Sequence, residues 1–406
     1  MPYRLRPTRD LDEFRAALRP ITHYFGASVS EEDADRFARL LPLDRFHVVL
    51  EERAIVGGAG AFPFELTVPG GPVPCAGVTV VGVLPTHVRR GLLGRMMRAQ
   101  LADIRERGEP LAALWASAET LYGRYGYGLA TTGLGVKADL HRVGLRAGLP
   151  AREGSVRLLD DAESLRALPP LYDRIRRRTT GFLSRSRDWW EHRVLRDTPE
   201  RRRGAGHLER ALLELDGRAA GYALYRVAQE GSGADWVKIV RVTEAFGVDA
   251  RATREVWRFL LGIDWMDTLE AWHLPLDHPL KLIVARLNLL EARELDALWV
   301  RLVDVGAALT ARAYTGNGRL TLEVTDDPVL PDNVGRWTIE GGVARRSRRR
   351  PDVRLDVQTL GMAYLGGFSF AQLARGELVE EVASGGIARA DALFRTAHAP
   401  WCPEIF

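Results

Sequence analysis

Two arginines and a glycine lie where an apolar run gives way to a helical pattern. The stretch VVGVLPTHVRRGLLGRMMRAQL covers residues 80–101, and its apolar run ends at Pro85. Arg89, Arg90 and Gly91 directly precede the helix. Because the first backbone N–H groups of a helix are unpaired and carry a partial positive charge, phosphate binds there readily. We expect Gly91 to leave room for an anion and the arginines to bond its oxygens, although two exposed arginines at an ordinary helix start fit the same residues.

The kind of anion site can be narrowed by exclusion. The sequence contains no G-x-x-x-x-G-K-[ST] loop, and no G-x-G-x-x-G directly follows the strand. The predicted loop therefore differs from the familiar nucleotide-binding loops.

A tyrosine in a glycine-rich stretch is the second candidate for chemistry. Tyr122 follows the predicted strand LAALWAS and opens the stretch YGRYGYG. A phenol with a pKa of about 10 can protonate a departing thiolate, since a thiol titrates at about 8.5. We expect Tyr125 and Tyr127 to be packing aromatics around a turn.

The last residues, HAPWCPEIF, are apolar for a chain end. In water, Trp401, Ile405 and Phe406 would expose apolar surface, so we expect the tail to dock. Pro400 and Pro403 stiffen it. Docking gives the α-carboxylate of Phe406 a definite position, and a tail packed only for stability would fit the same residues.

The elements that must position these residues follow from hydrophobic periodicity. Helices are predicted at LDEFRAALRPI and DADRFARLL, and strands at FHVVLEE and AIVGGAGAFPFELTV, around a turn at Glu51–Arg53. A Gly/Pro turn and a β-branched strand follow, then a helix from Leu93 whose apolar face only Gln100 interrupts. That helix ends near Gly108, before the strand LAALWAS. The order predicts an α/β or α+β domain with a mixed sheet.

Residues of about 150–290 repeat this order. A hairpin turns at Asp216–Gly217, and WVKIVRVTEAFGVDARATREVWRFLLGIDW is typical of strand, loop and helix. No Arg-Arg-Gly precedes the second helix, so a duplicated fold would have lost its anion site here. A third segment, from about residue 295, has short strands, turns and two late helices. We expect its basic run ARRSRRRP to be a solvated loop or hairpin tip.

The composition describes a folded protein with more than one domain. A chain of 406 residues exceeds one ordinary core, and 46% hydrophobic residues exclude a disordered chain. We see no secretory signal and no stretch long enough to span a bilayer. The two cysteines, Cys75 and Cys402, lack metal-ligand spacing, and we do not expect a disulfide between them. These features predict a cytoplasmic, reduced protein without a bound metal.

Two motifs carry a resemblance to known acetyltransferases. VGVLPTHVRRGLLG is similar to the acetyl-CoA loop of the GNAT superfamily, where a V-x-V strand precedes P-x-x-[QR]-x-x-G-x-[GA]; Val88 and Leu93 depart from that pattern. P-T-H-x-R-R-G-L-L, followed by ASAETLYGRYGYG at residues 116–128, resembles more narrowly the Eis family of actinobacterial N-acetyltransferases. The chain end WCPEIF is also similar to that family. The resemblance covers essentially the whole chain.

The resemblance implies an α/β (α+β) fold in three domains. These are a GNAT domain with an acetyl-CoA site at residues 1–145 and a second GNAT-like domain without a cofactor site at residues 146–293. A sterol-carrier-protein-like domain at residues 294–406 would place its end in the active site. A homo-oligomer is implied as well, a hexamer in the best-known members of the family.

Roles for single residues are implied in the same way. Tyr122 would be the general acid and the Phe406 α-carboxylate the general base. Backbone groups of Val81 and Val83 would pair with the pantetheine arm of acetyl-CoA, and the N–H groups from Arg89 to Gly94 would cradle its pyrophosphate. The implied cofactor-binding residues are Val81, Gly82, Val83, Arg89, Arg90, Gly91, Leu92, Leu93, Gly94, Ser117 and Ala118.

A carboxylate is a weak base for this work. With a pKa of about 3.5 it cannot readily deprotonate an ammonium group of pKa about 10. The Phe406 carboxylate would therefore act through water, or orient an amine that its surroundings have already deprotonated.

The implied reaction is acetyl-CoA-dependent acetylation of amines on aminoglycosides or similar polyamines, at several positions. A polycationic acceptor favours an acidic, partly aromatic pocket. SVSEEDADRF supplies such residues, although its acids also suit the start of a helix: Glu31, Glu32, Asp33, Asp35 and Phe37.

Other functions remain open from the sequence. The chain could acetylate protein lysines or other small amines, or carry an apolar ligand. Nucleic-acid binding through the arginine clusters at 176–178 and 345–350 lacks a recognisable module. We therefore expect neither a nucleic acid nor a membrane as a partner.

Overall fold

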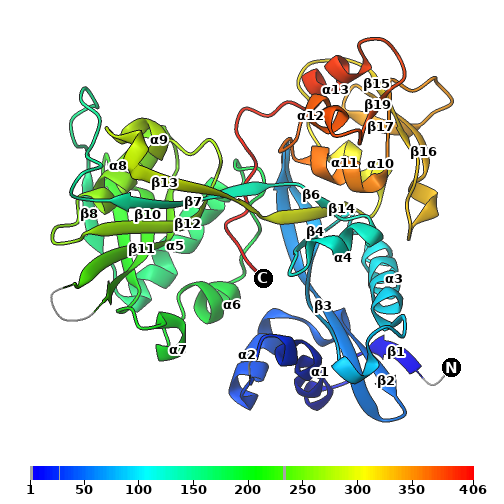
Figure 1. The fold of residues 1–406 in the computed structure, drawn as a ribbon, viewed down its shortest axis with the longest axis horizontal. Helices are drawn as coiled ribbons and strands as arrows, with labels where there is room; N and C mark the ends of the chain where they lie inside the picture. The colour runs from blue at the N-terminus through cyan, green and yellow to red at the C-terminus, as the bar shows by residue number, and fades with distance from the viewer. Residues whose placement is uncertain (1–2, 27, 232–234) are drawn as a thin grey trace. The chain divides into compact units, whose positions relative to one another are not determined.

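A computed structural model describes residues 3–26, 28–231 and 235–406, which form two compact units (Figure 1). The first unit combines the residues up to Thr131 with Ala297–Phe406. The second unit is Thr132–Asp296. The first unit is therefore built from two separate stretches of chain.

The main sheet of the first unit has the strand order β1-β2-β3-β4-β5-β14-β6. Its strands are β1 (Tyr3–Pro7), β2 (Phe46–Glu51), β3 (Ala54–Val68), β4 (Gly71–Val83), β5 (Leu111–Trp115), β6 (Gly128–Leu129) and β14 (Leu298–Leu302). Strands β4 and β5 run parallel, and the other neighbours run antiparallel. The sheet is mixed, as predicted, and one of its inner strands comes from beyond residue 297.

The helices predicted for the first stretch are confirmed. They are α1 (Leu11–Tyr24), α2 (Glu31–Leu40) and α3 (Leu92–Glu106), with a short α4 (Glu119–Tyr122) after β5. Helix α3 buries Met96, Met97 and Leu101 against the sheet. Gln100, which interrupts this apolar face, is buried too and donates from Nε2 to the Gly60 carbonyl on β3 at 3.0 Å. The polar residue thus ties the helix to the sheet.

The remainder of the first unit carries a five-stranded sheet of order β17-β16-β15-β18-β19. Its elements are β15 (Leu320–Val324), β16 (Gly335–Glu340), β17 (Val343–Arg346), β18 (Val353–Leu355), β19 (Glu380–Glu381), α10 (Val305–Ala311), α11 (Val357–Tyr364), α12 (Phe370–Arg375) and α13 (Gly386–Phe394). The fully buried Arg301 of β14 pairs with Asp327 at 2.6 Å. Its Nε also donates to the carbonyl of Tyr125, so β14 holds the glycine-rich stretch in place.

The second unit repeats the order strand, helix and parallel strand. Its sheet, of order β13-β7-β12-β11-β10-β9-β8, consists of β7 (Thr132–Asp139), β8 (Ser155–Leu158), β9 (Glu209–Leu215), β10 (Arg218–Glu230), β11 (Val237–Gly247), β12 (Thr268–Leu274) and β13 (Leu290–Asp296). Its helices are α5 (Asp161–Arg176), α6 (Arg187–Trp189), α7 (Pro199–Arg202), α8 (Ala250–Leu261) and α9 (Leu280–Ile283). The predicted hairpin is confirmed, since β9 and β10 join through Asp216–Gly217. Strand β11, parallel to β12, leads into α8 as β4 leads into α3.

Strand pairing divides the chain at other positions than the predicted 145/146 and 293/294. Strand β7 pairs with β12 and β13, because its alternate residues Leu134, Val136 and Ala138 belong to the second core. Strand β13 continues to Asp296, and β14 pairs with β5 in the first sheet. The chain is therefore divided between the two compact units at 131/132 and 296/297.

Candidate active site

The start of helix α3 is open to an anion. Gly91 caps the helix in the left-handed conformation, with φ of 74°, and no side chain accepts a hydrogen bond at this end. The first helical bond joins the N–H of Arg95 to the Gly91 carbonyl at 3.1 Å, so the N–H groups of Leu92, Leu93 and Gly94 precede it. A Cβ at position 91 would meet nothing within 4 Å. Glycine is needed here for its φ, and not because a protein atom crowds it.

The two arginines of the loop have different surroundings. Arg89 is exposed, has a φ of 62°, and forms no hydrogen bond or ion pair with any residue that the structure describes. Arg90 donates to the Tyr3 hydroxyl at 2.6 Å and to the Thr86 carbonyl at 3.0 Å. The side chain of Arg89 is therefore free for a ligand, whereas that of Arg90 already holds the loop to β1.

Glu51, at the end of β2, fastens the same loop. Its carboxylate lies 2.9 Å from Nε2 of His87 and 3.8 Å from the guanidinium of Arg90. A hydrogen bond with His87, and then one with Tyr3, holds the pKa of Glu51 below its ordinary value. The sequence did not identify Glu51 as a site residue, because its position indicated only the start of a turn.

Strand β4 bulges where the predicted V-x-V segment begins. Gly58 pairs with Gly82 and Gly60 with Thr79, so Val80 and Val81 lie opposite the single residue between the two glycines. Val80 has a φ of 55°, which is rare for a β-branched residue. Such outliers persist only where the surrounding structure enforces them.

The pairing of β4 with its parallel neighbour β5 ends before this bulge. The pairing of β4 with β5 covers three residues of each strand and ends at Gly77 and Ala113. Of the predicted cofactor residues beyond that point, Val81 is half-buried, and Gly82 and Val83 are buried. The Val83 carbonyl accepts a hydrogen bond from the Tyr24 hydroxyl at 2.8 Å. The separation of two parallel strands leaves an edge on which an extended ligand can pair.

Tyr122 lies beside this separation. It is buried in a cluster that includes Val78 of β4, and the half-buried Val81 and Leu93 pack against the same cluster. Burial raises the pKa of Tyr122 above its ordinary value, and a hydrogen bond with Ser117 lowers it in part. Ser117 and the next residue, Ala118, precede α4, of which Tyr122 is the last residue. The hydroxyl therefore stays protonated at neutral pH.

The two other tyrosines of the glycine-rich stretch pack as expected. Tyr127 is fully buried, 6.2 Å from Tyr122 between ring centroids, and its hydroxyl has no hydrogen-bond partner within the described chain. Tyr125 is half-buried, and its hydroxyl would lie 3.6 Å from a Cβ at Gly94.

The C-terminal ring lies where β4 and β5 separate. Phe406 packs against Phe64 of β3, with ring centroids 5.2 Å apart, and against Phe62 at 6.3 Å. A Cβ at Gly77, the last β4 residue paired with β5, would lie 3.1 Å from the Phe406 ring. No hydrogen bond or ion pair joins the Phe406 carboxylate to another described residue.

The residues before Phe406 fix the tail to β5. The indole Nε1 of Trp115, the last residue of β5, donates to the carbonyl of Glu404 at 2.6 Å. Trp401 and Cys402 are buried, and neither Cys402 nor Cys75 is part of a disulfide. The tail is docked, as predicted.

The acidic stretch at the start of α2 serves the helix and its neighbours. Ser30 caps the helix by accepting from the N–H of Asp33, which pairs with Arg36 at 2.7 Å. The same arginine pairs with Glu32 at 2.9 Å, and Asp35 pairs with Arg15 of α1 at 2.7 Å.

The aromatic residue of that stretch lies near the tail. Phe37 packs edge-on against Phe62 at 5.6 Å, and Phe62 contacts Phe406. Of the predicted pocket wall, the aromatic residue reaches the site, while three of the acids are paired with arginines elsewhere.

In the second unit, the corresponding helix α8 is capped at its start by an acidic side chain of the protein. Asp249 caps α8 and accepts from the N–H of Ala252 at 2.8 Å, where Gly91 caps α3 without a side chain. Glu153 pairs with Arg251 at 2.6 Å and with Arg254 at 2.8 Å, so the arginines of this helix start are already paired.

Residues 3–26, 28–231 and 235–406 hold neither a cluster of metal-ligating side chains nor a helix that could span a membrane. No three His, Cys, Asp or Glu side chains gather there as metal ligands would. In the same ranges, no helix combines the length and apolarity needed to cross a membrane.

Three family descriptions match successive parts of the chain. An acetyltransferase (GNAT) domain matches residues 4–130, a second acetyltransferase (GNAT) domain matches residues 181–302, and a sterol carrier protein domain matches residues 305–403. The bulged β4, the open start of α3 and Tyr122 all lie in the first of these matches.

Relatives are similar over nearly the whole chain. An uncharacterized N-acetyltransferase of Streptomyces avermitilis is 39% identical over 95% of both chains. The N-acetyltransferase Eis of Mycobacterium tuberculosis H37Ra is 34% identical over 90% of both chains. The crystal structure of Eis1 from Mycobacterium abscessus is 33% identical and superposes with a TM-score of 0.87, covering 99% of this chain and all of the other.

Proposed function

This chain belongs to the Eis family of N-acetyltransferases, and we propose that it transfers acetyl groups from acetyl-CoA directly to amines of aminoglycosides or similar polyamines, at more than one position. It is a transferase with two GNAT domains and a sterol-carrier-protein-like domain. The observation that carries the proposal is the packing of Phe406 on Gly77, at the point where β4 leaves β5.

Acetyl-CoA fits the residues around this point. We assign its pyrophosphate to the N–H groups from Arg89 to Gly94, because the helix start there is uncapped by any side chain. Arg89 adds a free guanidinium. The pantetheine arm would pair with backbone groups of Val81, Gly82 and Val83, beyond the end of the β4–β5 pairing. Ser117 and Ala118, the other two proposed cofactor-binding residues, follow β5, the strand beside β4.

The transfer needs a base and an acid on the two sides of the thioester. The acceptor amine attacks the carbonyl carbon, a C–N bond forms, and the C–S bond breaks. The Phe406 carboxylate orients the neutral amine and accepts through water the proton that the nitrogen loses as the C–N bond forms, and Tyr122 gives its proton to the departing sulfur. Burial supports the second role, since it keeps the Tyr122 hydroxyl protonated.

The polycationic acceptor is proposed from membership of the family, with support from the aromatic residues beside the tail. Phe62 and Phe64 pack against the Phe406 ring, and Phe37 packs against Phe62. Aromatic faces bind cationic amines. Protein lysines and other small amines share that chemistry, so they belong in the same test.

Three further features are part of the proposal. One chain binds one acetyl-CoA, because the helix start in the second unit is filled by Asp249. The chain forms a homo-oligomer, as a hexamer, and works in the cytoplasm. Calorimetric titration with CoA tests the first of these: two sites per chain would contradict it.

Moving the terminal carboxylate, either with the Phe406 ring removed or with the ring kept in place, tests the mechanism. We expect deletion of Phe406, and addition of one glycine after it, each to lower kcat by about 100-fold or more. Phe406→Leu keeps the carboxylate at the chain end and should retain most of kcat. Thiol release from acetyl-CoA is measured with aminoglycosides, with linear polyamines and with lysine peptides, alongside acetyl-CoA affinity and thermal unfolding.

The outcomes separate the roles. Full activity in the glycine-extended chain would contradict the carboxylate as base and leave the tail a structural element. Activity on lysine peptides alone would overturn the polyamine acceptor and keep the acetyl transfer.

A further inference from the structure

Strand β13 is an exposed edge of the second sheet. It comes first in the order β13-β7-β12-β11-β10-β9-β8, and its residues 291–294 are all exposed. An edge strand offers a row of backbone N–H and C=O groups for pairing with another chain. Natural edges are often protected by charged side chains, because a second copy would bring like charges together. Whether β13 is protected in this way depends on the order of the charged residues along it and across the neighbouring strands.

A ladder of alternating charges crosses the sheet and ends on this edge. Arg241 of β11 is paired in register with Glu270 of β12, Glu270 with Lys137 of β7, and Lys137 with Glu291 of β13. Glu270 lies 3.5 Å from Arg241 and 3.8 Å from Lys137 between charged atoms. The signs alternate from positive to negative at each step, and a cation beyond Glu291 would continue them.

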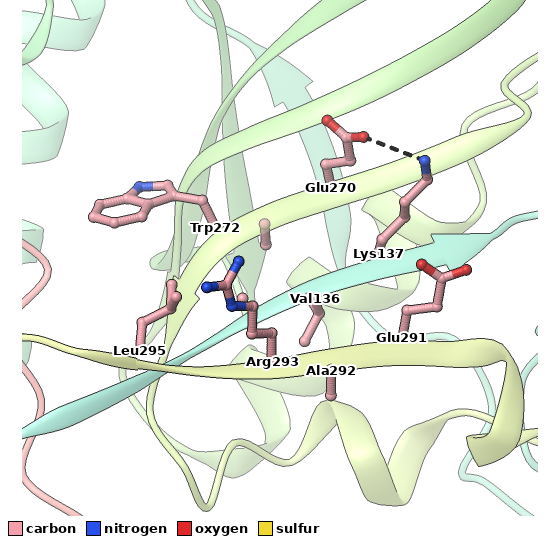
Figure 2. A pocket seen from close by; sticks show the side chains of 10 residues that line it. Val136, Lys137, Glu270, Trp272, Glu291, Ala292, Arg293 and Leu295 are labelled. Atoms are coloured by element: carbon pink, nitrogen blue, oxygen red, sulfur yellow. Dashed lines mark ion pairs between the residues drawn. The ribbon is translucent and has the colours of Figure 1, made fainter.

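The two charged residues at the edge have no ionic partner. Neither Glu291 nor Arg293 forms a hydrogen bond or ion pair through its side chain within residues 3–26, 28–231 and 235–406. Figure 2 shows both side chains on the face of the sheet that also carries Glu270, Lys137 and Trp272. The edge therefore presents one free carboxylate and one free guanidinium, two residues apart on one face.

The same face is hollowed beside the strand. An open hollow of about 410 Å³ lies over β7, β12 and β13, where Gly135 contributes no side chain. The indole of Trp272, 47% exposed, and Leu295 border it, and Arg293 projects into it (Figure 2). Apolar surface thus adjoins the charged edge.

Symmetry restricts how a second copy can pair with this edge. Two edge strands run antiparallel side by side when a two-fold axis stands perpendicular to the sheet. Rotation about that axis keeps each side chain on the same face of the combined sheet. A residue of one strand can therefore lie opposite only the same residue of the second copy, or a residue an even number of positions away from it. Centring on Glu291 or Arg293 brings like charges together. Centring on Ala292 places Glu291 opposite Arg293 twice.

We propose that β13 pairs antiparallel with β13 of a second copy of this chain, centred on Ala292, so that Glu291 and Arg293 form two reciprocal ion pairs across a two-fold axis. The pairing joins the two sheets into one and continues the charge ladder through Arg293 of the second copy. It rests on the homo-oligomer proposed above but uses none of the acetyl-transfer chemistry.

A charge swap tests the ion pairs. In sedimentation velocity of the full chain, Glu291→Arg and Arg293→Glu should each weaken self-association about 10-fold, because each puts like charges opposite each other. The double variant E291R/R293E restores opposite charges and should associate within about 3-fold of the parent. Glu294→Arg makes the same charge change on the other face of the strand and is the matched control. Circular dichroism and thermal unfolding report whether each variant is folded.

A cysteine at the two-fold axis tests the register. Ala292→Cys brings two thiols together, since opposed residues have Cα atoms about 4.5–5.5 Å apart, within the range of a disulfide. Diamide, as oxidant, should convert this variant to a covalent dimer on a non-reducing gel. Glu294→Cys places its thiols four residues out of register and should not cross-link. The native Cys75 and Cys402 are buried and serve as the background.

Several results would overturn the interface. A parent chain that is monomeric at all concentrations would do so, and so would an oligomer that E291R leaves unchanged. Rapid cross-linking through Glu294→Cys in place of Ala292→Cys would overturn the register. A monomer that still acetylates amines would contradict the interface alone, whereas an inactive oligomer with E291R sensitivity would contradict the proposed reaction alone.

Discussion

At the scale of single residues, neighbours of one type have separate roles. Arg89 and Arg90 are adjacent in the same loop, yet only Arg90 contacts Tyr3 and Thr86. Tyr122 and Tyr127 are both buried, yet only Tyr122 has a hydrogen bond, with Ser117. Residue type alone does not distinguish these pairs, because their roles depend on what each polar atom contacts.

We expect Tyr122→Phe to lower kcat about 100-fold while acetyl-CoA affinity is unchanged, because only the proton for the departing thiolate is lost. Burial raises the pKa of Tyr122 above its ordinary value of about 10. The hydroxyl is the acid while protonated, so in the parent enzyme its ionisation should not lower kcat below about pH 10. Steady-state kinetics between pH 7 and pH 10 measure both effects.

The matched control is Tyr127→Phe. The Tyr127 hydroxyl is buried without a partner among the described residues, so removing it should leave kcat unchanged and raise the free energy of unfolding by about 1 kcal/mol. Equal losses of kcat in the two variants would show that both tyrosines only pack, and would remove Tyr122 from the mechanism.

At the scale of elements, the loop between β4 and α3 is held by strands far from it in sequence. Glu51 of β2 contacts His87 and Arg90, and Tyr3 of β1 contacts Arg90. These contacts orient the loop whose N–H groups face the proposed pyrophosphate. Glu51 is therefore a positioning residue, since it acts through His87 and Arg90.

We expect Glu51→Gln to raise the KM for acetyl-CoA by about 3- to 10-fold and to leave kcat within about two-fold. The loop loses contacts that orient it, whereas the residues that carry out the acetyl transfer are unchanged. Charge alone predicts the opposite sign: removing a negative group near a phosphate site should tighten binding. Glu52→Gln changes the same charge in the same turn and is the control. A lower KM in Glu51→Gln would contradict the positioning role.

At the scale of the whole molecule, the first unit is closed by a strand from the second half of the chain. Strand β14 lies between β5 and β6, and it pairs Trp299 with Leu129 and Val300 with Gly128. The two stretches of the first unit that flank the second unit in the sequence are close together, since the N–H of Leu298 donates to the Thr131 hydroxyl at 3.0 Å. The second unit is thus inserted where β6 and β14 would otherwise form a simple hairpin.

We expect Thr132–Asp296 to fold as a separate protein. A first unit in which a two- to four-residue turn joins Thr131 to Ala297 should also fold and bind acetyl-CoA. Residues 1–131 alone should fail to fold, because the sheet would lack β14. Thermal unfolding by circular dichroism and acetyl-CoA titration measure these outcomes. A cooperative transition in the fragment 1–131 would contradict the need for β14.

Much of the local structure was determined by the sequence itself. The helices α1, α2, α3 and α8 and the hairpin β9–β10 lie where periodicity and turn residues predict them. The conformation of Gly91 and the uncapped start of α3 also depend on residues a few positions apart. Such features are encoded locally, because amphipathic spacing and turn chemistry act between neighbours.

Contacts between residues far apart in the sequence are set by the fold. The glycine-rich stretch was predicted as a turn, but Gly128 is required because a Cβ there would lie 2.1 Å from the Gln358 carbonyl of α11. The partners of Arg90, the strand that completes the sheet and the surface that receives Phe406 all come from far along the chain. Periodicity predicts which face of an element is buried but not what covers it, so these contacts follow only from the folded molecule.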